Sequence, residues 1–282
     1  RLGAREATSI FERTCPAVTV VDDGAVLPDG PTGAVVSRAD AVAAFTDAGP
    51  DAWPELDPTD PVAVVWTSGT TGLPKGAMYT ERMLCKLWTN ELMPDFADIP
   101  VLNVNFMPLN HLGGRIPLST AFQAGGTSYF VPESDLSTLF DDWNLVRPTE
   151  MGLVPRVAEM LYQRYQSAVD RLVALGADAG SAESQARAEL RGRVLGGRIV
   201  TAFCGTAPLA AEMRTFVETS LDVHVLDGYG LTEVGMVTKD GRITRPPVLD
   251  YKLIDVPELG YFRTEIGRAS CRESVFISVV AV

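Results

Sequence analysis

The sequence predicts an α/β fold in which mainly parallel sheets are flanked by helices. From residue 61 onward, short apolar segments alternate with segments of helical periodicity, a pattern typical of parallel strands joined by crossover helices. The composition agrees, because 282 residues with 46% hydrophobic and 21% charged side chains are enough for a large core or two subdomains.

The first sixty residues are predicted to form a partial subdomain and a linker. Residues 16–21 have the character of a buried strand, and residues 37–49 that of a helix capped by Ser37 or Asp40. The stretch "PDAWPELDPTDP", residues 50–61, contains four prolines in twelve residues. It is predicted to connect subdomains without forming an element.

Residues 61–264 are predicted to form the main core. The predicted strands are 62–67, 101–108, 126–131, 197–205 and 222–230. The predicted helices are 80–92, 118–125, 135–148, 155–176, 181–196 and 209–221. Residues 265–282 look like a sequencing adapter read in frame and are expected to be a foreign or disordered tail; "VFISVVAV" within them would form an exposed edge strand if it were native.

Charge and composition exclude several classes of function. The net charge of −12 argues against electrostatic binding of nucleic acid or of an anionic membrane. No apolar run is long enough for a membrane span. The four cysteines are scattered without metal-ligand spacing, so a reducing cytoplasm is expected. The first methionine is Met78, which suggests a piece of a longer protein.

The stretch "TSGTTGLPKG", residues 67–76, is the first candidate site. Backbone N–H groups of such a loop converge on phosphate oxygens when glycines supply positive φ, and this is expected at Gly69, Gly72 and Gly76. Hydroxyl groups and the Lys75 ammonium would add donors. A solvated turn remains an alternative at this point, whereas a Walker A loop is excluded because Gly76 follows the lysine.

The longer string "WTSGTTGLPKGAM" resembles the phosphate loop of the adenylate-forming superfamily, which includes acyl-CoA synthetases, luciferases and adenylation domains. The resemblance implies a layered αβαβα large N-terminal domain, here partial, with the small C-terminal domain absent. It also implies that ATP phosphates are bound by the following residues: Thr67, Ser68, Gly69, Thr70, Thr71, Gly72 and Lys75.

Two further motifs carry the same resemblance. "DGYGLTEVG", residues 227–235, implies that Thr232 contacts the α-phosphate and that Glu233 binds Mg²⁺. A carboxylate beside a triphosphate does require a divalent cation. "FCGTAPLA", residues 203–210, resembles the segment that approaches adenine. The residues implied to line adenine are Gly205, Thr206, Ala207, Asp227, Gly228, Tyr229 and Gly230.

"FMPLNHLGG", residues 106–114, resembles the segment whose histidine lies near the substrate carboxylate, which makes His111 the candidate there. His224 lies on a predicted strand without such a motif and is interpreted as structural. The expected chemistry is attack of a small-molecule carboxylic acid on the α-phosphorus of ATP. Lys75, Thr232 and Mg²⁺ would act mainly by positioning and charge neutralisation.

Longer stretches, including "GAMYTERM" and "RPPVLDYKLIDVPELGYF", resemble the carboxylic acid reductase branch. That branch implies partner carrier and reductase domains, with phosphopantetheine and NADPH bound outside this chain. Leu231 stands where the branch has a serine, so the acid pocket is expected to be smaller. Without the family's C-terminal segments, weak nucleotide binding and poor turnover are expected. The alternatives are a stand-alone acyl-CoA ligase and a nucleotide-binding module without turnover.

Overall fold

The computed structural model describes residues 4–22, 25, 27, 33–47, 55–67, 74–88, 99–205, 207, 209–245, 248, 250–254 and 276–280. The chain divides into two compact units, Arg1–Leu84 and Cys85–Val282. The predicted division at residues 60, 61 and 264 therefore stays a prediction, since the boundary between the units falls inside the predicted core.

In the first unit, two strands and two helices precede a hairpin. Strands β1 (Val18–Val21) and β2 (Ala34–Ser37) are parallel neighbours. Helices α1 (Ala4–Thr14) and α2 (Arg38–Asp47) flank them in sequence. The Ser37 hydroxyl accepts a hydrogen bond from the Asp40 backbone N–H at 3.1 Å and donates to the Asp40 carboxylate at 2.8 Å, which confirms the predicted helix cap.

The hairpin of the first unit pairs β3 (Pro61–Thr67) with β4 (Lys75–Thr80) in antiparallel register. Helix α3 (Glu81–Trp88) follows directly. Before the hairpin, the Asp57 carboxylate accepts hydrogen bonds from the backbone N–H and the hydroxyl of Thr59 at 2.8 and 2.6 Å. Residues 55–60 form turns without a helix or strand, and Pro61 already belongs to β3. Residues 50–54 of the predicted linker lie outside the described residues, so the linker stays a prediction. Strand β4 was not predicted from the sequence.

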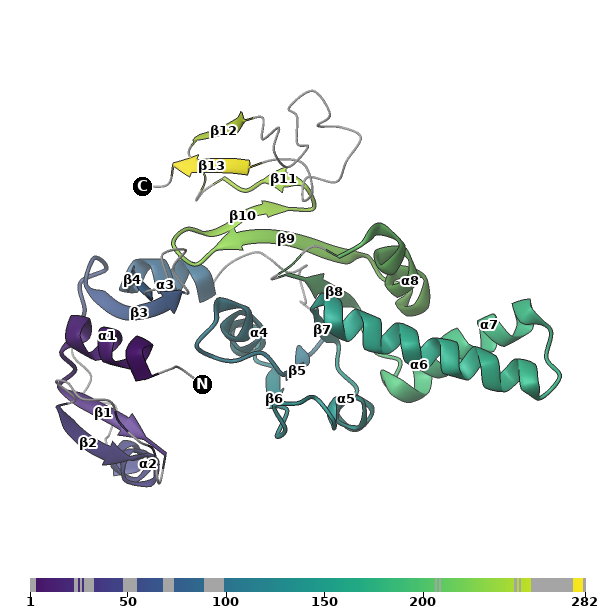
Figure 1. The fold of residues 1–282 in the computed structure, drawn as a ribbon, viewed down its shortest axis with the longest axis horizontal. Helices are drawn as coiled ribbons and strands as arrows, with labels where there is room; N and C mark the ends of the chain where they lie inside the picture. The colour runs from purple at the N-terminus through teal and green to yellow at the C-terminus, as the bar shows by residue number, and fades with distance from the viewer. Residues whose placement is uncertain are drawn as a thin grey trace. The chain divides into compact units, whose positions relative to one another are not determined.

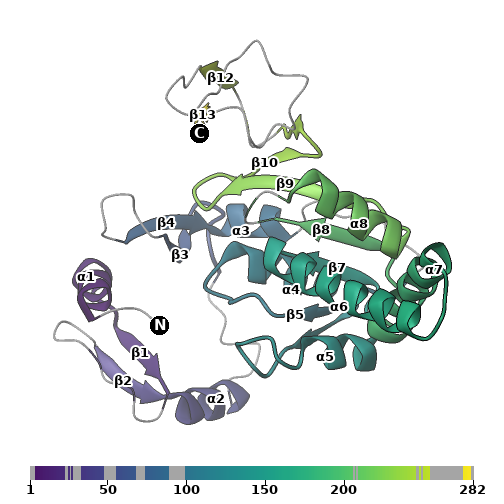
Figure 2. The ribbon, with the colours of Figure 1, turned by 45° about the vertical axis from the view of Figure 1, so that its right-hand side comes forward.

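The five-stranded sheet of the second unit is parallel on one side and antiparallel on the other (Figure 2). Strands β7 (Glu150–Leu153), β8 (Thr201–Cys204) and β9 (Val225–Leu231) pair in parallel. Strands β10 (Gly235–Lys239) and β11 (Arg242–Ile243) continue the sheet in antiparallel order. The α/β class with mainly parallel strands is thus confirmed, and the antiparallel extension had not been predicted.

A second parallel pair lies beside this sheet. Strands β5 (Leu102–Asn105) and β6 (Thr127–Phe130) are parallel and are joined by helix α4 (Leu112–Gln123). Thr149, just before β7, accepts a hydrogen bond from the Leu102 N–H through its hydroxyl and donates its own N–H to the Leu102 carbonyl, both at 2.9 Å. The following residue of each strand is also in contact, since the Asn103 amide donates to the Glu150 carboxylate. Strands β5 and β7 therefore run in the same direction.

The core of the second unit lies between this sheet and its helices. Helices α5 (Leu139–Val146), α6 (Pro155–Ala174) and α8 (Ala211–Leu221) pack against it. Helix α6 buries Val157, Ala158, Leu161, Tyr165 and Leu172. These positions recur with helical spacing, so one face of the helix is apolar. Their burial is the main source of stability for this layer.

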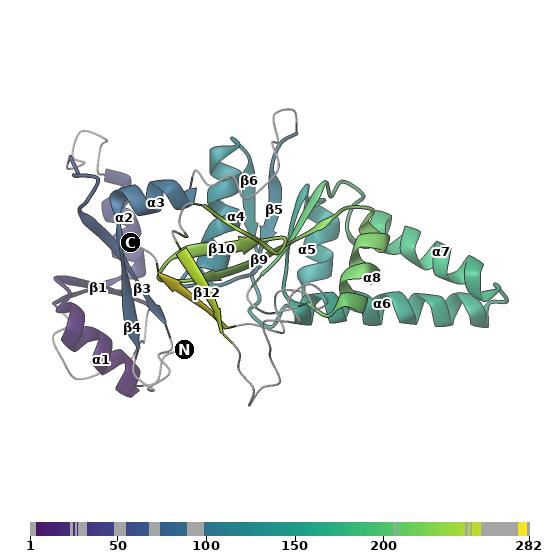
Figure 3. The same cartoon turned by 90° about the horizontal axis from the view of Figure 1, so that it is seen from above.

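Helix α6 is followed by an antiparallel partner, α7 (Ala179–Glu189), and the pair extends away from the sheet (Figure 1, Figure 3). The Asp178 carboxylate caps α7 by accepting the Ser181 N–H at 3.0 Å. The helix ends in a π-helical turn, η2 (Leu190–Val194). Strands β12 (Asp250–Ile254) and β13 (Phe276–Val280) form a separate antiparallel pair. No helix in the described part is long and apolar enough to cross a membrane.

Candidate nucleotide and carboxylate site

The predicted phosphate loop connects the strands of the β3–β4 hairpin. Ser68, Gly69, Thr70, Thr71 and Gly72 lie outside the described residues. Their flanking residues Thr67 and Lys75 are directly opposite each other in the hairpin, and the Thr67 hydroxyl donates to the Lys75 carbonyl at 3.3 Å. The Lys75 side chain is exposed. The two ends of the loop are therefore held together.

Arg13 is a contact of this loop that sequence reasoning missed. Its guanidinium donates a hydrogen bond to the carbonyl of Pro74 at 2.9 Å, from helix α1 and 61 positions away in sequence. Pro74 itself is buried. The residue before Lys75 is thus fixed by a long-range contact, which no local pattern in the sequence reveals.

The expectation of positive φ at Gly76 was wrong. Gly76 pairs with Trp66 as an ordinary residue of β4, and its φ is outside the left-handed region. A Cβ at this position would lie 2.7 Å from Cγ1 of Val64 and 3.2 Å from the Trp66 ring. Crowding against the side chains of Val64 and Trp66 therefore gives glycine a packing reason at this position, in place of a turn of the backbone.

Two of the predicted adenine-binding glycines lie just after β8 and within β9. Gly205 follows β8 and is buried, and Gly228 lies within β9. A Cβ on Gly205 would be 2.8 Å from the Phe203 ring, and one on Gly228 would be 2.7 Å from the same ring. Packing around Phe203 therefore gives a structural reason for both glycines. Thr206 lies outside the described residues, and the exposed Ala207 is next to it.

Thr232 and Glu233 lie in the tight turn that joins β9 to β10. Leu231 and Gly235 are paired across this turn, and the Val234 N–H donates to the Leu231 carbonyl at 3.2 Å. Gly235 has a positive φ of 79°. Glu233 is exposed, while Thr232 and Leu231 are half-buried. The turn follows Gly230 and the 39% exposed Tyr229, so this motif forms one continuous segment.

Asp227, at the start of this motif, is held by two residues that the sequence analysis did not identify. Its carboxylate forms an ion pair with Arg214 of α8, and its backbone N–H donates to the Asp240 carboxylate at 2.8 Å. His224 lies between two carboxylates, with Nδ1 2.8 Å from Glu218 and Nε2 3.2 Å from Asp240. These contacts agree with the interpretation of His224 as structural.

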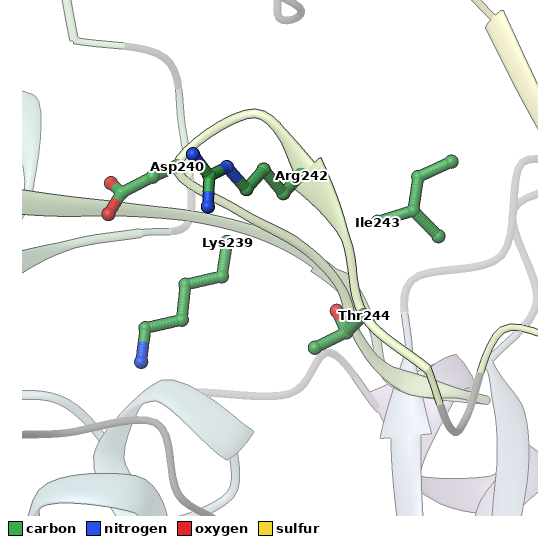
Figure 4. A pocket seen from close by; sticks show the side chains of 5 residues that line it. All are labelled: Lys239, Asp240, Arg242, Ile243 and Thr244. Carbon is green, nitrogen blue, oxygen red and sulfur yellow. The ribbon is translucent and has the colours of Figure 1, made fainter.

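A hollow of about 530 Å³ lies on the β10–β11 hairpin, lined by residues of its two strands and turn. Figure 4 shows Asp240 and Arg242 at the turn, with Ile243 and Thr244 further along the second strand. None of the predicted site residues lines this hollow. Its link to the motif is Asp240, which accepts the N–H of Asp227.

His111 lies at the N-terminus of α4, after the end of β5. It is the N-cap residue with an extended backbone, φ −110° and ψ 144°, and its exposed side chain makes no capping hydrogen bond. Because β5, β7, β8 and β9 run in the same direction, the segments that follow them begin at one edge of the sheet. His111, Gly205 and Thr232 all belong to such segments.

Glu150 is a buried carboxylate that the sequence analysis did not identify. It is 2% exposed on β7. One oxygen accepts a hydrogen bond from the Asn103 amide at 2.8 Å, and the other has no partner among the described residues. Burial raises the pKa of Glu150 to about 7, against the smaller opposing effect of the Asn103 hydrogen bond. Its position inside a strand of mixed composition gave no signal of this.

The described residues contain no group of three or more His, Cys, Asp or Glu side chains arranged to hold a metal ion. The exposed carboxylate of Glu233 could supply one ligand. Mg²⁺ in nucleotide sites is usually held by one or two carboxylates together with phosphate oxygens and water. A single glutamate therefore fits an ion that is bound together with a nucleotide.

Comparison with known proteins gives a family match over nearly the whole chain. The model described as "AMP-binding enzyme" matches residues 2–267. The chain belongs to the AMP-binding enzyme family. The match reaches further toward the N-terminus than the motifs in the sequence indicated. Each strand-end motif of the second unit therefore lies within an AMP-binding enzyme domain.

Among curated relatives of this AMP-binding chain, the carboxylic acid reductase of Segniliparus rugosus is 48% identical over 227 residues, covering 78% of this chain and 18% of that protein. Long chain acyl-CoA synthetase 7, peroxisomal, of Arabidopsis thaliana is 28% identical over 237 residues, covering 72% of this chain and 33% of that protein. The AMP-binding chain therefore spans about a fifth to a third of the length of these relatives.

Solved structures agree with the sequence relatives. The adenylation domain of a carboxylate reductase from Mycobacterium chelonae superposes with a TM-score of 0.82 at 35% identity, over 99% of this chain and 49% of that one. The adenylation domain from Segniliparus rugosus, solved with AMP and a co-purified carboxylic acid, gives 0.80 at 34% identity, over 99% and 50%. The AMP-binding chain thus has the adenylation-domain fold of carboxylic acid reductases.

Proposed function

We propose that this chain is the nucleotide- and acid-binding part of an enzyme that activates a carboxylic acid with ATP, and that the enzyme is a carboxylic acid reductase. The observation that carries the proposal is the difference in similarity. Identity is 48% to a carboxylic acid reductase but 28% to an acyl-CoA synthetase over regions of similar length. The ATP motifs alone would not distinguish these two classes.

In this proposal the phosphate loop, Thr67 to Gly72 with Lys75, binds the β- and γ-phosphates of ATP through its N–H groups, hydroxyls and ammonium. Thr232 contacts the α-phosphate. The adenine is lined by the segments on either side of Phe203: Gly205, Thr206 and Ala207 after β8, and Asp227 to Gly230 in β9. The exposure of Lys75, Tyr229 and Glu233 supports these roles, because a ligand can reach all three.

The substrate carboxylate attacks the α-phosphorus of ATP, the bond to the β-phosphate oxygen breaks, and pyrophosphate leaves with an acyl-adenylate remaining. His111 lies beside the acid in this scheme, on an exposed helix N-terminus where partial positive charge favours a carboxylate. A Mg²⁺ ion bound by Glu233 would neutralise phosphate charge. Little proton transfer is required, so positioning and electrostatic stabilisation account for most of the rate.

The partners follow from the same branch. The acyl group is proposed to pass to phosphopantetheine on a carrier domain and to be reduced by NADPH on a reductase domain, both outside this chain. A structure from Segniliparus rugosus contains an adenylation domain together with its carrier domain. Such an enzyme is proposed to work in the cytoplasm on a small-molecule acid.

The test is exchange of labelled pyrophosphate into ATP by the enzyme that contains this chain, assayed with and without added acid. Exchange should require an acid, and Glu233→Ala should lower it by at least about a hundredfold, because the metal would lose its protein ligand. Glu159→Ala, which removes an exposed carboxylate of α6, is the matched control. Unchanged exchange in Glu233→Ala would reject the assignment of the metal ligand.

A second candidate is a stand-alone acyl-CoA ligase, favoured by the match to the Arabidopsis acyl-CoA synthetase. Both functions share the adenylation step and differ in the acceptor of the acyl group. Formation of a thioester on free CoA would support the ligase, and transfer only to a carrier-bound thiol would support the reductase. A nucleotide-binding module without turnover would bind ATP but catalyse no exchange.

A further inference from the structure

Strand β5 carries two buried amide side chains on the face that meets helix α4. Asn103 is 1% and Asn105 is 3% exposed, and residues two apart in a strand point to the same side. A buried amide is costly unless its donors and acceptors are paired. An interface between a strand and a helix is normally apolar, so this pair needs an explanation.

Both amides bind carbonyl groups of α4 from the side. The Asn105 amide donates to the Gly114 carbonyl at 2.6 Å, and the Asn103 amide donates to the Pro117 carbonyl at 2.7 Å. Residues 114 and 117 are three apart and lie on one face of the helix. The two-residue spacing of the asparagines in the strand therefore matches the three-residue spacing of the carbonyls in the helix. The two hydrogen bonds fix the position of α4 along β5.

Asn105 also holds the segment that precedes α4. Its side-chain oxygen Oδ1 accepts the Met107 N–H at 3.2 Å, so one side chain connects the first residues after β5 to the first turn of the helix. Between these points the chain is closed by its own backbone, with His111 N–H bonded to the Pro108 carbonyl at 3.0 Å and Gly114 N–H to the His111 carbonyl at 3.1 Å.

Two further contacts restrict the same segment. The Arg115 guanidinium donates to the Leu109 carbonyl at 2.6 Å. Gly114 lies so close that a Cβ would be 2.4 Å from the Pro108 carbonyl oxygen and 2.6 Å from that of Met107. Residues 107–111 are therefore enclosed between Asn105 on one side and the bare α-carbon of Gly114 on the other.

We infer that Asn105 is a positioning residue for His111, acting through the turn of residues 107–111. The inference rests on the proposed function in one respect: the reason for holding His111 is to present it to a substrate carboxylate. A functional side chain keeps its geometry better when further hydrogen bonds and packing contacts hold its backbone segment than when it lies on a free loop. Asn103 supports the arrangement by fixing the next turn of α4.

The test uses the two-histidine composition of the chain. NMR spectra of ¹⁵N-histidine-labelled protein show only His111 and His224, and the His224→Gln variant assigns them. In Asn105→Leu, the His111 ring signals should shift or broaden while those of His224 stay in place. Hydrogen exchange at the Met107 and His111 amides should become about tenfold faster or more, because their local opening becomes easier.

Two other variants separate positioning from general loss of stability. Val217→Ala creates a cavity in α8, at a site 1% exposed, and should leave the His111 signals and the exchange at Met107 unchanged. Gly114→Ala disturbs the same turn from the opposite side and should reproduce the effect of Asn105→Leu, which keeps the inference testable if Asn105→Leu fails to fold. Unchanged His111 signals in both variants, or equal changes at both histidines, would overturn the inference.

Addition of benzoate with AMP distinguishes this inference from the proposed function. A benzoate-dependent shift of the His111 ring, weakened about tenfold in apparent affinity by Asn105→Leu, supports both. If benzoate never shifts His111 but the Met107 amide still depends on Asn105, the positioning inference stands and the role of His111 beside the acid fails.

Discussion

At the scale of single residues, Glu150 shows how burial controls chemistry. The carboxylate lies inside the sheet with one oxygen bonded to Asn103 and the other without a described partner. Its ionised form has lost most of its hydration, and one amide donor does not replace it. No pattern in "RPTEMGLVP" distinguishes this glutamate from an exposed one, since the difference comes from β5 packing against β7.

Glu150 should make stability depend on pH. Burial raises its pKa from 4.5 to about 7 in the folded protein, so the folded state holds the proton more tightly than the unfolded state. The contribution of Glu150 to the free energy of unfolding is complete below about pH 4.5. It is lost as the pH rises through about 7, which lowers the free energy of unfolding by about 3 kcal/mol in total. Urea unfolding at several pH values should show this fall in the free energy of unfolding for wild type and a flatter profile for Glu150→Gln.

The comparison requires a control because other groups titrate in the same range. Glu159→Gln, at an exposed position of α6, should follow the wild-type profile. If Glu150→Gln also follows it, the carboxyl group does not carry a raised pKa in the folded protein.

At the scale of elements, packing explains why glycines end β8 and occur within β9. The Phe203 ring lies against both Gly205 and Gly228, and Met236 of β10 also approaches Gly228. Gly228→Ala should therefore lower the free energy of unfolding by about 1–3 kcal/mol, since the new methyl group overpacks the site. Phe203→Leu in the same chain should relieve part of this loss, which a double-mutant cycle by urea unfolding measures.

The same pair of variants tests the proposed adenine contact. If Gly228 is glycine only because of Phe203, the double variant should regain AMP affinity together with stability. Recovery of stability without recovery of AMP binding would instead indicate that the methyl group blocks the nucleotide.

Local sequence patterns predicted those helices and strands in which the apolar residues recur with one clear periodicity. Helix α6 was predicted from its apolar stripe, and the cap of α2 from Ser37 and Asp40. Strand β4 was missed because its first two residues were attributed to the glycine loop, its last residue to the following helix, and residues 77–79 to no element. Its pairing with β3 is a non-local contact. The antiparallel β10–β11 extension was missed for the same reason, since the register of β10 against β9 depends on the turn at Thr232 to Val234 and that of β11 against β10 on the turn at Asp240 and Gly241.

At the scale of the whole molecule, motifs identified the family because their order along the chain is specific, and the family match agrees. The partners that support the motifs were not predictable. Arg13 reaches Pro74 across 61 positions, and Asp240 reaches Asp227 across 13. Such contacts depend on tertiary packing, so a single sequence carries no local signal for Arg13 or Asp240.

Lys75 and Glu233 are both proposed to act on the phosphate tail of ATP, Lys75 as a cation and Glu233 as a ligand of Mg²⁺. Lys75→Ala should weaken ATP binding by about tenfold or more while leaving AMP binding nearly unchanged, because AMP lacks the β- and γ-phosphates. Mg²⁺ should strengthen ATP binding in wild type but not in Glu233→Ala.

Calorimetric titration with ATP and AMP, with Mg²⁺ or with EDTA, measures both effects. Arg171→Ala, which removes an exposed cation of α6, should behave as wild type. Equal losses for ATP and AMP in Lys75→Ala, or a full Mg²⁺ effect in Glu233→Ala, would show that these two residues do not bind the same triphosphate.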